Sequence, residues 1–259
     1  MKKHGWCLLL VALMLSLGAL PMRAESSDIM KKDVLVVGTE ATYPPFEYRN
    51  EKNEIVGYDI DVVRAIARHM GKEVEILDMA FDGLIPSLMT KKVDLVAAGM
   101  TNTAERRKRV DFSDVYYEIE NAFVVRNDDS SIATLDDLKG KTATVQIGTA
   151  QDTFITGTGL PKEIKRFQKN DDALMEILLG RGDFSVLNLT VANAFLRNNK
   201  LFGEYLKIGF RNFIHKQGEG IALGVPKGND DFLKALNDAI ALMKENGEFN
   251  ELKKKYHMD

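Results

Sequence analysis

The stretch VLVVGTEATYPPFE, residues 34–47, runs from an apolar segment into a polar turn that contains two consecutive prolines. Its first part, 34–38, is typical of a buried strand. Apolar residues then recur at helical spacing over 59–70, where Gly71 is expected to end the helix, and 74–77 has the pattern of the next strand. Short apolar strands that alternate with helices predict an α/β protein with mostly parallel sheets.

The same alternation continues along the chain and restarts at Lys139-Gly140-Lys141. We expect a short helix over 84–89, strands at 93–98, 142–147, 184–187 and 221–225, and further helices after 148–149, over 171–179 and over 190–196. A long helix should run from Asn229, as its cap, to Gly247. Two α/β blocks are therefore predicted. Because no Gly/Ser-rich tether separates them, we expect them to be joined by short extended crossings near 117–121 and 216–220.

The first 24 residues have the order of a secretory signal peptide. A short basic start, an apolar run over 7–20 and Ala24 before a polar segment predict cleavage after Ala24, with an uncleaved N-terminal anchor as the alternative. Cys7 is the only cysteine, and it lies too early in the apolar run for a lipoprotein signal. The mature chain would then contain no disulfide, which fits export into a bacterial periplasm.

The charge balance excludes some classes of partner. The formal net charge is −3, and nucleic-acid binding needs a concentrated basic surface, so no nucleic acid is expected. The histidines show no metal-ligand spacing, and no motif indicates a cofactor.

Three ordered stretches carry a resemblance to a known family. The first is GTEATYPPFE at 38–47, followed by GYDID at 57–61. The second is FDGLIPSL at 81–88 with the segment from Asp94 to Ser113, which contains AAGMTNTAER at 97–106. The third is LKGK at 138–141 with QIGTA at 146–150. In this order and spacing the chain resembles the bacterial extracellular solute-binding proteins of family 3, which bind polar amino acids for ABC importers.

The resemblance implies the type II periplasmic binding fold, in which two Rossmann-like α/β lobes, joined by a two-segment hinge, close on a ligand. After the signal peptide, 1–24, lobe 1 is expected at 25–119 and 217–259 and lobe 2 at 120–216. The implied protein is periplasmic and monomeric. It would capture an amino acid or an amino-acid-like small molecule and deliver it to the membrane permease of an ABC importer.

Arg106 is the residue expected to bind the ligand carboxylate. Its planar guanidinium can hold a carboxylate in a bidentate manner, and it lies in the first turn after the helix start at Thr101 to Thr103. From the other lobe, Gly148, Thr149 and Ala150 open a helix whose backbone N–H groups can bind the same anion. Closure of the lobes would therefore complete one anion site from two halves.

Other positions match the ligand-binding motifs of the family. The resemblance implies that Tyr43 and Phe81 stack on the ligand side chain, with ordinary core packing as the alternative, and that Glu40 contacts a polar or cationic group. Its motifs also bring Gly99, Met100 and Gln146 to the site.

Asn188 departs from the family pattern, which has an aspartate that pairs the ligand ammonium at this position. An asparagine can accept a hydrogen bond but brings no charge. Glu40 could supply the missing charge, the ligand could be held less tightly, or it could lack a normal ammonium. These alternatives stay open at this point.

Two other functions fit the same scaffold. One is a periplasmic enzyme similar to cyclohexadienyl dehydratases, which would need a general acid in the cleft, for which Glu40 is the obvious candidate. The other is a ligand-sensing protein that acts on a separate membrane receptor. The resemblance favours a binding protein without catalytic residues.

Overall fold

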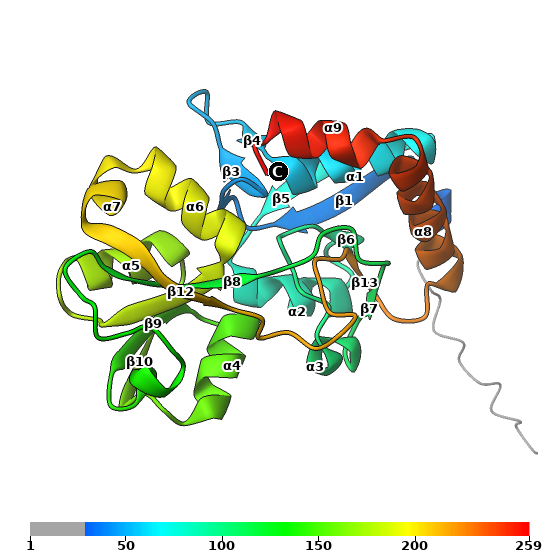
Figure 1. Ribbon diagram of the computed structural model, residues 1–259. Coiled ribbons are helices and arrows are strands. Elements are labelled where there is room, and N and C mark those ends of the chain that lie inside the picture. The colour runs from blue at the N-terminus through cyan, green and yellow to red at the C-terminus, as the bar shows by residue number, and fades with distance from the viewer. Residues whose placement is uncertain (1–28, 259) are drawn as a thin grey trace, which may run out of the picture.

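The computed structural model describes residues 29–258 and shows two α/β lobes that lie side by side, each built around a five-stranded sheet (Figure 1). The predicted signal peptide, 1–24, lies outside the described residues. Among the described residues, none of the helices combines the length and the apolar composition needed to cross a membrane.

The first sheet has the strand order β5-β1-β6-β13-β7. Strand β1 is parallel to β5 and β6, whereas β13 is antiparallel to β6 and β7. The strands are β1 (Val34–Thr39), β5 (Glu73–Asp78), β6 (Leu95–Val96), β7 (Asp111–Phe112) and β13 (Gly224–Val225). Because β13 comes from the C-terminal part of the chain, this sheet is assembled from two separate segments.

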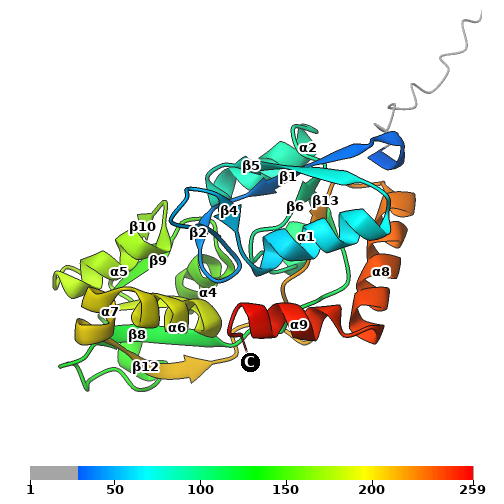
Figure 2. The ribbon, with the colours of Figure 1, turned by 90° about the horizontal axis from the view of Figure 1, so that it is seen from above.

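Helices cover both faces of the first sheet. They are α1 (Tyr58–His69), α2 (Leu84–Met89), α3 (Ala104–Arg107), α8 (Asp230–Glu245) and α9 (Glu248–Lys255). The apolar stripe of α1 packs with Leu35 and Val37, while α2 packs with Val36 and Val96, so the two helices lie on opposite faces. Helices α8 and α9 contact α1, and Figure 2 shows the three helices grouped together.

The second sheet has the strand order β10-β9-β11-β8-β12, in which β9 is parallel to β10 and β11, and β8 is antiparallel to β11 and β12. Its strands are β8 (Asn121–Arg126), β9 (Thr142–Gln146), β10 (Glu163–Phe167), β11 (Phe184–Asn188) and β12 (Leu206–Asn212). Its helices are α4 (Ala150–Thr158), α5 (Asn170–Leu178), α6 (Leu189–Asn198) and α7 (Lys200–Tyr205).

A small antiparallel sheet stands on the first lobe, close to the boundary with the second. It consists of β2 (Thr42–Tyr43), β3 (Glu47–Arg49) and β4 (Ile55–Val56), and its first turn contains a cis peptide bond between Pro44 and Pro45. Short 3-10 helices complete the described chain at Ile29–Lys31, Phe81–Gly83 and Asp136–Leu138.

Two extended segments connect the lobes, as the crossings expected from the sequence require. One leads from β7 to β8 and the other from β12 to β13, and they are bonded to each other: Ile221 N donates to Tyr117 O at 2.9 Å and Tyr116 N donates to Ile221 O at 3.1 Å. Both cross between the lobes in Figure 1. Two adjacent strand-like connections can bend together, which is the construction of a two-segment hinge.

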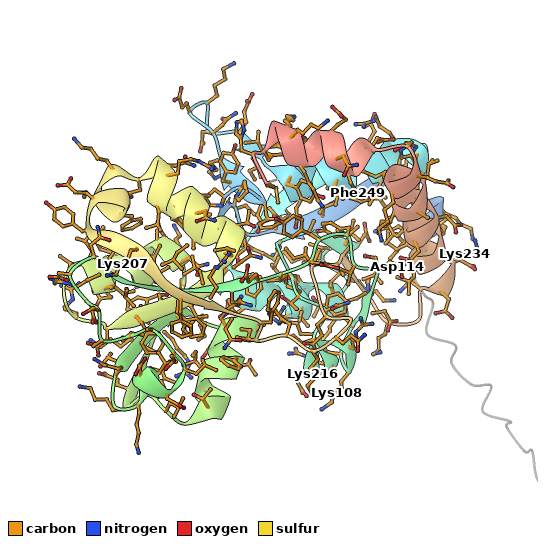
Figure 3. The ribbon with its side chains drawn as sticks, in the orientation of Figure 1. Lys108, Asp114, Lys207, Lys216, Lys234 and Phe249 are labelled. Carbon is orange, nitrogen blue, oxygen red and sulfur yellow. The ribbon has the colours of Figure 1, made fainter. Side chains whose placement is uncertain are left out.

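Aromatic side chains fill the region beneath these crossings. Phe46 makes edge contacts with Tyr58 and Tyr117, and Tyr116 stacks on Phe249 with ring centroids 6.0 Å apart. Figure 3 marks Phe249 on α9. This packing ties the C-terminal helix to the hinge and to the Pro44-Pro45 turn.

Some predicted elements differ in extent. The strands expected at 93–98 and 221–225 are shorter, at Leu95–Val96 and Gly224–Val225, and Ile221 makes isolated bridges instead. Asn229 does precede α8, but the prediction that its side chain caps the helix is wrong. Its amide nitrogen donates to the carbonyls of Pro226 and Lys227, and no capping bond forms.

Candidate ligand-binding cleft

The strand ends of both lobes meet at one cavity, which has about 360 Å³ of space between its side chains, part of it open to solvent. In open α/β sheets, ligands bind outside the carboxyl ends of the strands, where side chains from successive loops converge. All of the predicted site residues except Met100 and Gly148 line this cavity, namely Glu40, Tyr43, Phe81, Gly99, Thr101, Arg106, Gln146, Thr149, Ala150 and Asn188.

Arg106 reaches into the cavity from α3. The helix begins at Thr103, whose hydroxyl accepts a bond from Arg106 N. The guanidinium donates to Thr101 O at 2.8 Å and, across the cleft, to Gly148 O at 3.0 Å, and it lies over the Phe81 ring at 5.3 Å. Burial lowers the pKa of Arg106 to about 10. The side chain therefore stays charged at neutral pH and links the two lobes.

The basic residues that follow Arg106 in the sequence do not share its position. Arg107, Lys108 and Arg109 are exposed, and Lys108 pairs with Glu105 on the surface. Figure 3 marks Lys108 at the outer edge of the molecule.

The start of α4 forms the wall opposite Arg106. Thr149 is its N-cap: the hydroxyl accepts from Asp152 N at 3.1 Å and donates to Gln146 O at 2.8 Å. The first N–H groups of a helix have no acceptor within the helix, and the helix dipole is positive there. Ala150 and Gln151 both line the cavity at this point, so the arrangement can hold an anion next to Arg106.

Glu40 provides a buried negative charge on another part of the wall. It follows β1 and is 5% exposed. One carboxylate oxygen accepts from the Thr42 hydroxyl and the other from Gln146 Nε2 of the second lobe at 3.3 Å. Burial raises the pKa of Glu40 above its ordinary value, although these bonds partly counteract the shift. A cationic group placed here would compensate a carboxylate that has lost most of its water.

Tyr43 and Gly99 fit closely against each other. A Cβ added at Gly99, where φ is +52°, would lie 2.7 Å from the Tyr43 ring, so only glycine leaves room for this aromatic wall. The Tyr43 ring also stacks on Phe46, which lies beneath it in the core. Tyr43 therefore lines the cavity and packs against the core at the same time.

Met100 lies elsewhere: it is buried in the apolar cluster behind α2 and lines a neighbouring hollow. Conversely, Ala98, Ile119 and Gln151 line the cavity but are absent from the predicted set. Gln151 Nε2 donates to Asn121 Oδ1 at 2.7 Å. Its place, one residue beyond the QIGTA motif in the first turn of α4, is the signal that could have revealed it.

Two further carboxylates lie under the cavity without lining it. Asp59 accepts from Gly99 N at 2.8 Å, and burial raises its pKa to about 7. Burial, followed by the nearby charge of Asp59, raises the pKa of Glu47 well above its ordinary value. The Asp59 bond fixes the backbone at Gly99, on which Tyr43 rests.

Asn188 ends β11 and begins α6. Its Oδ1 accepts from Thr190 N at 2.8 Å, which caps the helix. The side chain is 2% exposed, and its Nδ2 has no hydrogen-bond partner among the described residues.

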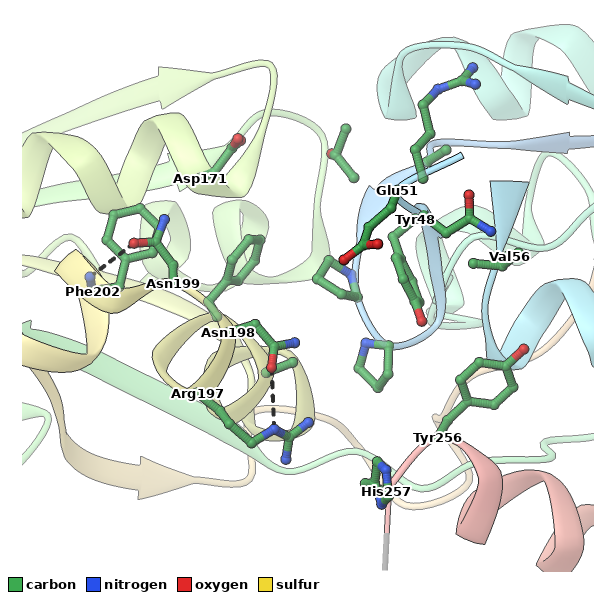
Figure 4. A pocket seen from close by; sticks show the side chains of 18 of the residues that line it. Tyr48, Glu51, Val56, Asp171, Arg197, Asn198, Asn199, Phe202, Tyr256 and His257 are labelled. Carbon is green, nitrogen blue, oxygen red and sulfur yellow. Dashed lines mark hydrogen bonds between the residues drawn. The ribbon is translucent and has the colours of Figure 1, made fainter. Parts of the chain in front are cut away.

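A second, wider hollow opens between the lobes on the side of the small sheet (Figure 4). Its labelled side chains include Tyr48 and Glu51 on the first lobe and Arg197 and Asn198 on the second. Glu51, Arg197 and Asn198 are exposed, so solvent already satisfies these charges and polar groups. Among residues 29–258, no group of three or more His, Cys, Asp or Glu side chains is arranged to hold a metal.

Comparison with known proteins places this geometry in a family. The sequence profile of the "Bacterial extracellular solute-binding proteins, family 3" matches residues 35–259. The arginine-binding extracellular protein of Bacillus subtilis is 38% identical, over 99% of this chain and 98% of that protein. The L-arginine-binding protein of Pseudomonas aeruginosa is 32% identical, over 96% and 95%. An ancestral arginine-binding protein solved with arginine has a TM-score of 0.81 and 39% identity, over 87% of this chain and 98% of that one.

These relatives are named as binding proteins and cover nearly the whole chain. They confirm the predicted resemblance, the two-lobed type II fold and the expectation of a solute-binding protein and not an enzyme on the same scaffold. The chain belongs to the bacterial extracellular solute-binding proteins of family 3.

Proposed function

We propose that this protein captures a small carboxylic acid of amino-acid type that carries a positive charge at its far end, and delivers it to the membrane permease of an ABC importer. The observation that carries the proposal is one cavity between the lobes with a guanidinium on one wall and a buried carboxylate on another. Arginine-binding relatives of similar length are consistent with such a ligand.

The carboxylate end of the ligand is assigned to Arg106 and to the first N–H groups of α4. A carboxylate between these groups would receive charge-assisted bonds from both lobes. In the described structure Arg106 already spans the cleft to Gly148 O. Exchange of this neutral acceptor for a carboxylate would strengthen the bridge, and that gain in free energy would favour the closed state.

The positive end of the ligand is assigned to Glu40, and Tyr43 and Phe81 form aromatic walls of the same cavity. Aromatic faces also attract cations, which adds to the charge pairing. Gln146 holds the carboxylate of Glu40 from the second lobe and is itself held by Asn170 Nδ2 at 2.6 Å. This orientation of Glu40 therefore also depends on closure of the lobes.

We further propose that lobe 1 comprises 25–119 and 217–259, that lobe 2 comprises 120–216, and that the protein works as a monomer after removal of a signal peptide, 1–24. The strand membership of the two sheets supports this division. In this scheme the closed monomer presents both lobes to the permease, and opening of the hinge releases the ligand.

A thermal-shift screen of residues 25–259 tests the function. The compounds are the common L-amino acids, amines, simple carboxylates, and guanidino or amino acids with and without an α-ammonium. A ligand at about a thousand times its Kd should stabilise the protein by roughly 4 kcal/mol. Stabilisation by compounds that combine a carboxylate with a distal cation supports the proposal. If only compounds without one of these groups stabilise the protein, the proposal is wrong.

The pH dependence of binding should identify Glu40 as the cation partner. A bound cation lowers the raised pKa of Glu40, so binding releases a proton near that pKa. Affinity should be full above the pKa of the free protein and should fall as the pH drops through it. Calorimetry from about pH 4 to about pH 8 should show this fall for a guanidino ligand but not for its neutral ureido counterpart.

The matched variants are Glu40→Gln and Glu51→Gln. Glu40→Gln should weaken binding of the cation about tenfold or more and remove the pH dependence. Glu51 is exposed and lines only the outer hollow, so its variant should behave as the unaltered chain. An unchanged pH profile in Glu40→Gln would contradict the assignment.

A further inference from the structure

The amide of Asn188 is oriented by a bond whose polarity is certain. Its capping partner is the backbone N–H of Thr190, at 2.8 Å. A backbone N–H can only donate, so the amide atom that faces it must be the oxygen. The oxygen of the Asn188 amide therefore caps α6.

The other polar group of this amide is Nδ2, which is a donor. It is buried, it has no partner among the described residues, and the side chain to which it belongs lines the cavity. A buried amide donor without a partner costs about 1–3 kcal/mol. An occupant of the cavity that offers an acceptor at this point would recover that free energy.

A second amide donor stands beside it. Asn121 pairs directly with Asn188 across β8 and β11, and directly paired residues project from the same face of a sheet. The oxygen of Asn121 accepts from Gln151, while its own Nδ2 also has no partner among the described residues. Two buried amide donors therefore lie on neighbouring strands, and one of them, that of Asn188, belongs to a residue that lines the cavity. Neither residue brings a negative charge.

We propose that the cavity selects a ligand that carries a small neutral acceptor, an α-hydroxyl or α-oxo group, where an amino acid carries its α-ammonium. The inference rests on the proposed function, because the α-position is defined by the carboxylate at Arg106. An ammonium has three donors and no acceptor. Next to Asn188, an ammonium would place its N–H donors against the Nδ2 donor and its positive charge against a wall without a negative charge. A hydroxyl or keto oxygen can instead accept the Nδ2 hydrogen.

The experiment compares L-arginine with its α-hydroxy and α-oxo analogues and with the analogue that lacks any α-substituent. Each is titrated calorimetrically into the unaltered chain and into Asn188→Asp. Aspartate caps a helix as well as asparagine does, so Thr190 N keeps its acceptor and the fold is retained. The second carboxylate oxygen then faces the cavity as a charged acceptor.

The unaltered chain should bind the hydroxy or oxo analogue about tenfold or more tightly than L-arginine, and Asn188→Asp should reverse this order. Asn198→Asp adds the same charge at the exposed end of α6 and should leave the order unchanged. If the unaltered chain binds L-arginine more tightly than the analogues, and Asn188→Asp shows the same ratio of affinities, the inference is overturned. The proposed function would remain intact. If none of the compounds binds either protein, the proposed function fails as well.

Discussion

Arg106→Ala should reduce ligand affinity by at least about thirtyfold while the protein remains folded. Truncation of one partner of a buried, hydrogen-bonded charge pair costs about 2–5 kcal/mol, which corresponds to this range. The ligand carboxylate would keep only the N–H groups of α4 and would stay buried without a countercharge. Stability should change little, because Arg106 packs against the Phe81 ring and carbonyl oxygens at the cleft and not in either core.

Two companion variants make this result specific. Arg107→Ala removes the same side chain from the next position of α3, where it is exposed and, within residues 29–258, donates to Asn102 O alone. This variant should bind normally. Arg106→Lys keeps the charge but loses the planar fork, so its affinity should lie between the two. Calorimetry measures affinity, and thermal unfolding without ligand checks the fold. Binding by Arg106→Ala as tight as that of the unaltered chain would refute the assignment of the carboxylate.

Gly57→Ala should destabilise the protein by about 3 kcal/mol or more, the largest stability effect expected from the loss of a single glycine here. Gly57 precedes α1 with φ 139° and ψ 174°, a conformation that is essentially restricted to glycine. An added Cβ would lie 2.1 Å from Phe46 O and 2.8 Å from Glu47 N. The backbone cannot yield easily, because Tyr58 N and Asp59 N are bonded to Pro45 O and Phe46 O at 2.9 Å.

Gly71→Ala is the matched control. Its φ is also positive, at +67°, but apart from its chain neighbours no atom of the described residues lies within 4 Å of the added Cβ. Only the left-handed backbone then opposes the change, at about 1–2 kcal/mol. Urea unfolding of both variants measures the difference. Equal losses of stability would show that the contact with Phe46, as distinct from the backbone conformation, contributes nothing.

Local pattern predicted the elements whose periodicity is strong. The apolar stripe of α1 and the buried run of β1 are visible in the sequence because each buries a regular face. The glycines at 71 and 180 mark helix ends because only a positive φ is needed there. Ordered motifs likewise brought most of the cavity-lining residues together before any contact was known.

The antiparallel strands were harder to foresee. The sequence pattern does not predict β8 or β12, although residues 121–126 are largely apolar. Their pairing joins residues far apart along the chain, Asn212 with Asn121 and Asn188 with Asn121, and no local period encodes such partners. The capping prediction at Asn229 is wrong for a similar reason. Its side-chain nitrogen donates to the carbonyl oxygens of Pro226 and Lys227 in the preceding turn, contacts that the local sequence pattern does not reveal.

By itself, the sequence determined the alternating α/β pattern, the two blocks, the family and the presence of Arg106, Glu40 and Asn188 near a cleft, because these follow from residue type and order. Only the tertiary structure decided how each polar group is used. Whether Asn188 faces the cavity as donor or acceptor depends on Thr190 N, and whether Glu40 is oriented depends on Gln146 from the other lobe. Hydrogen bonds are directional and each atom has few of them, so the function of a buried polar side chain is settled by the partners that folding places beside it.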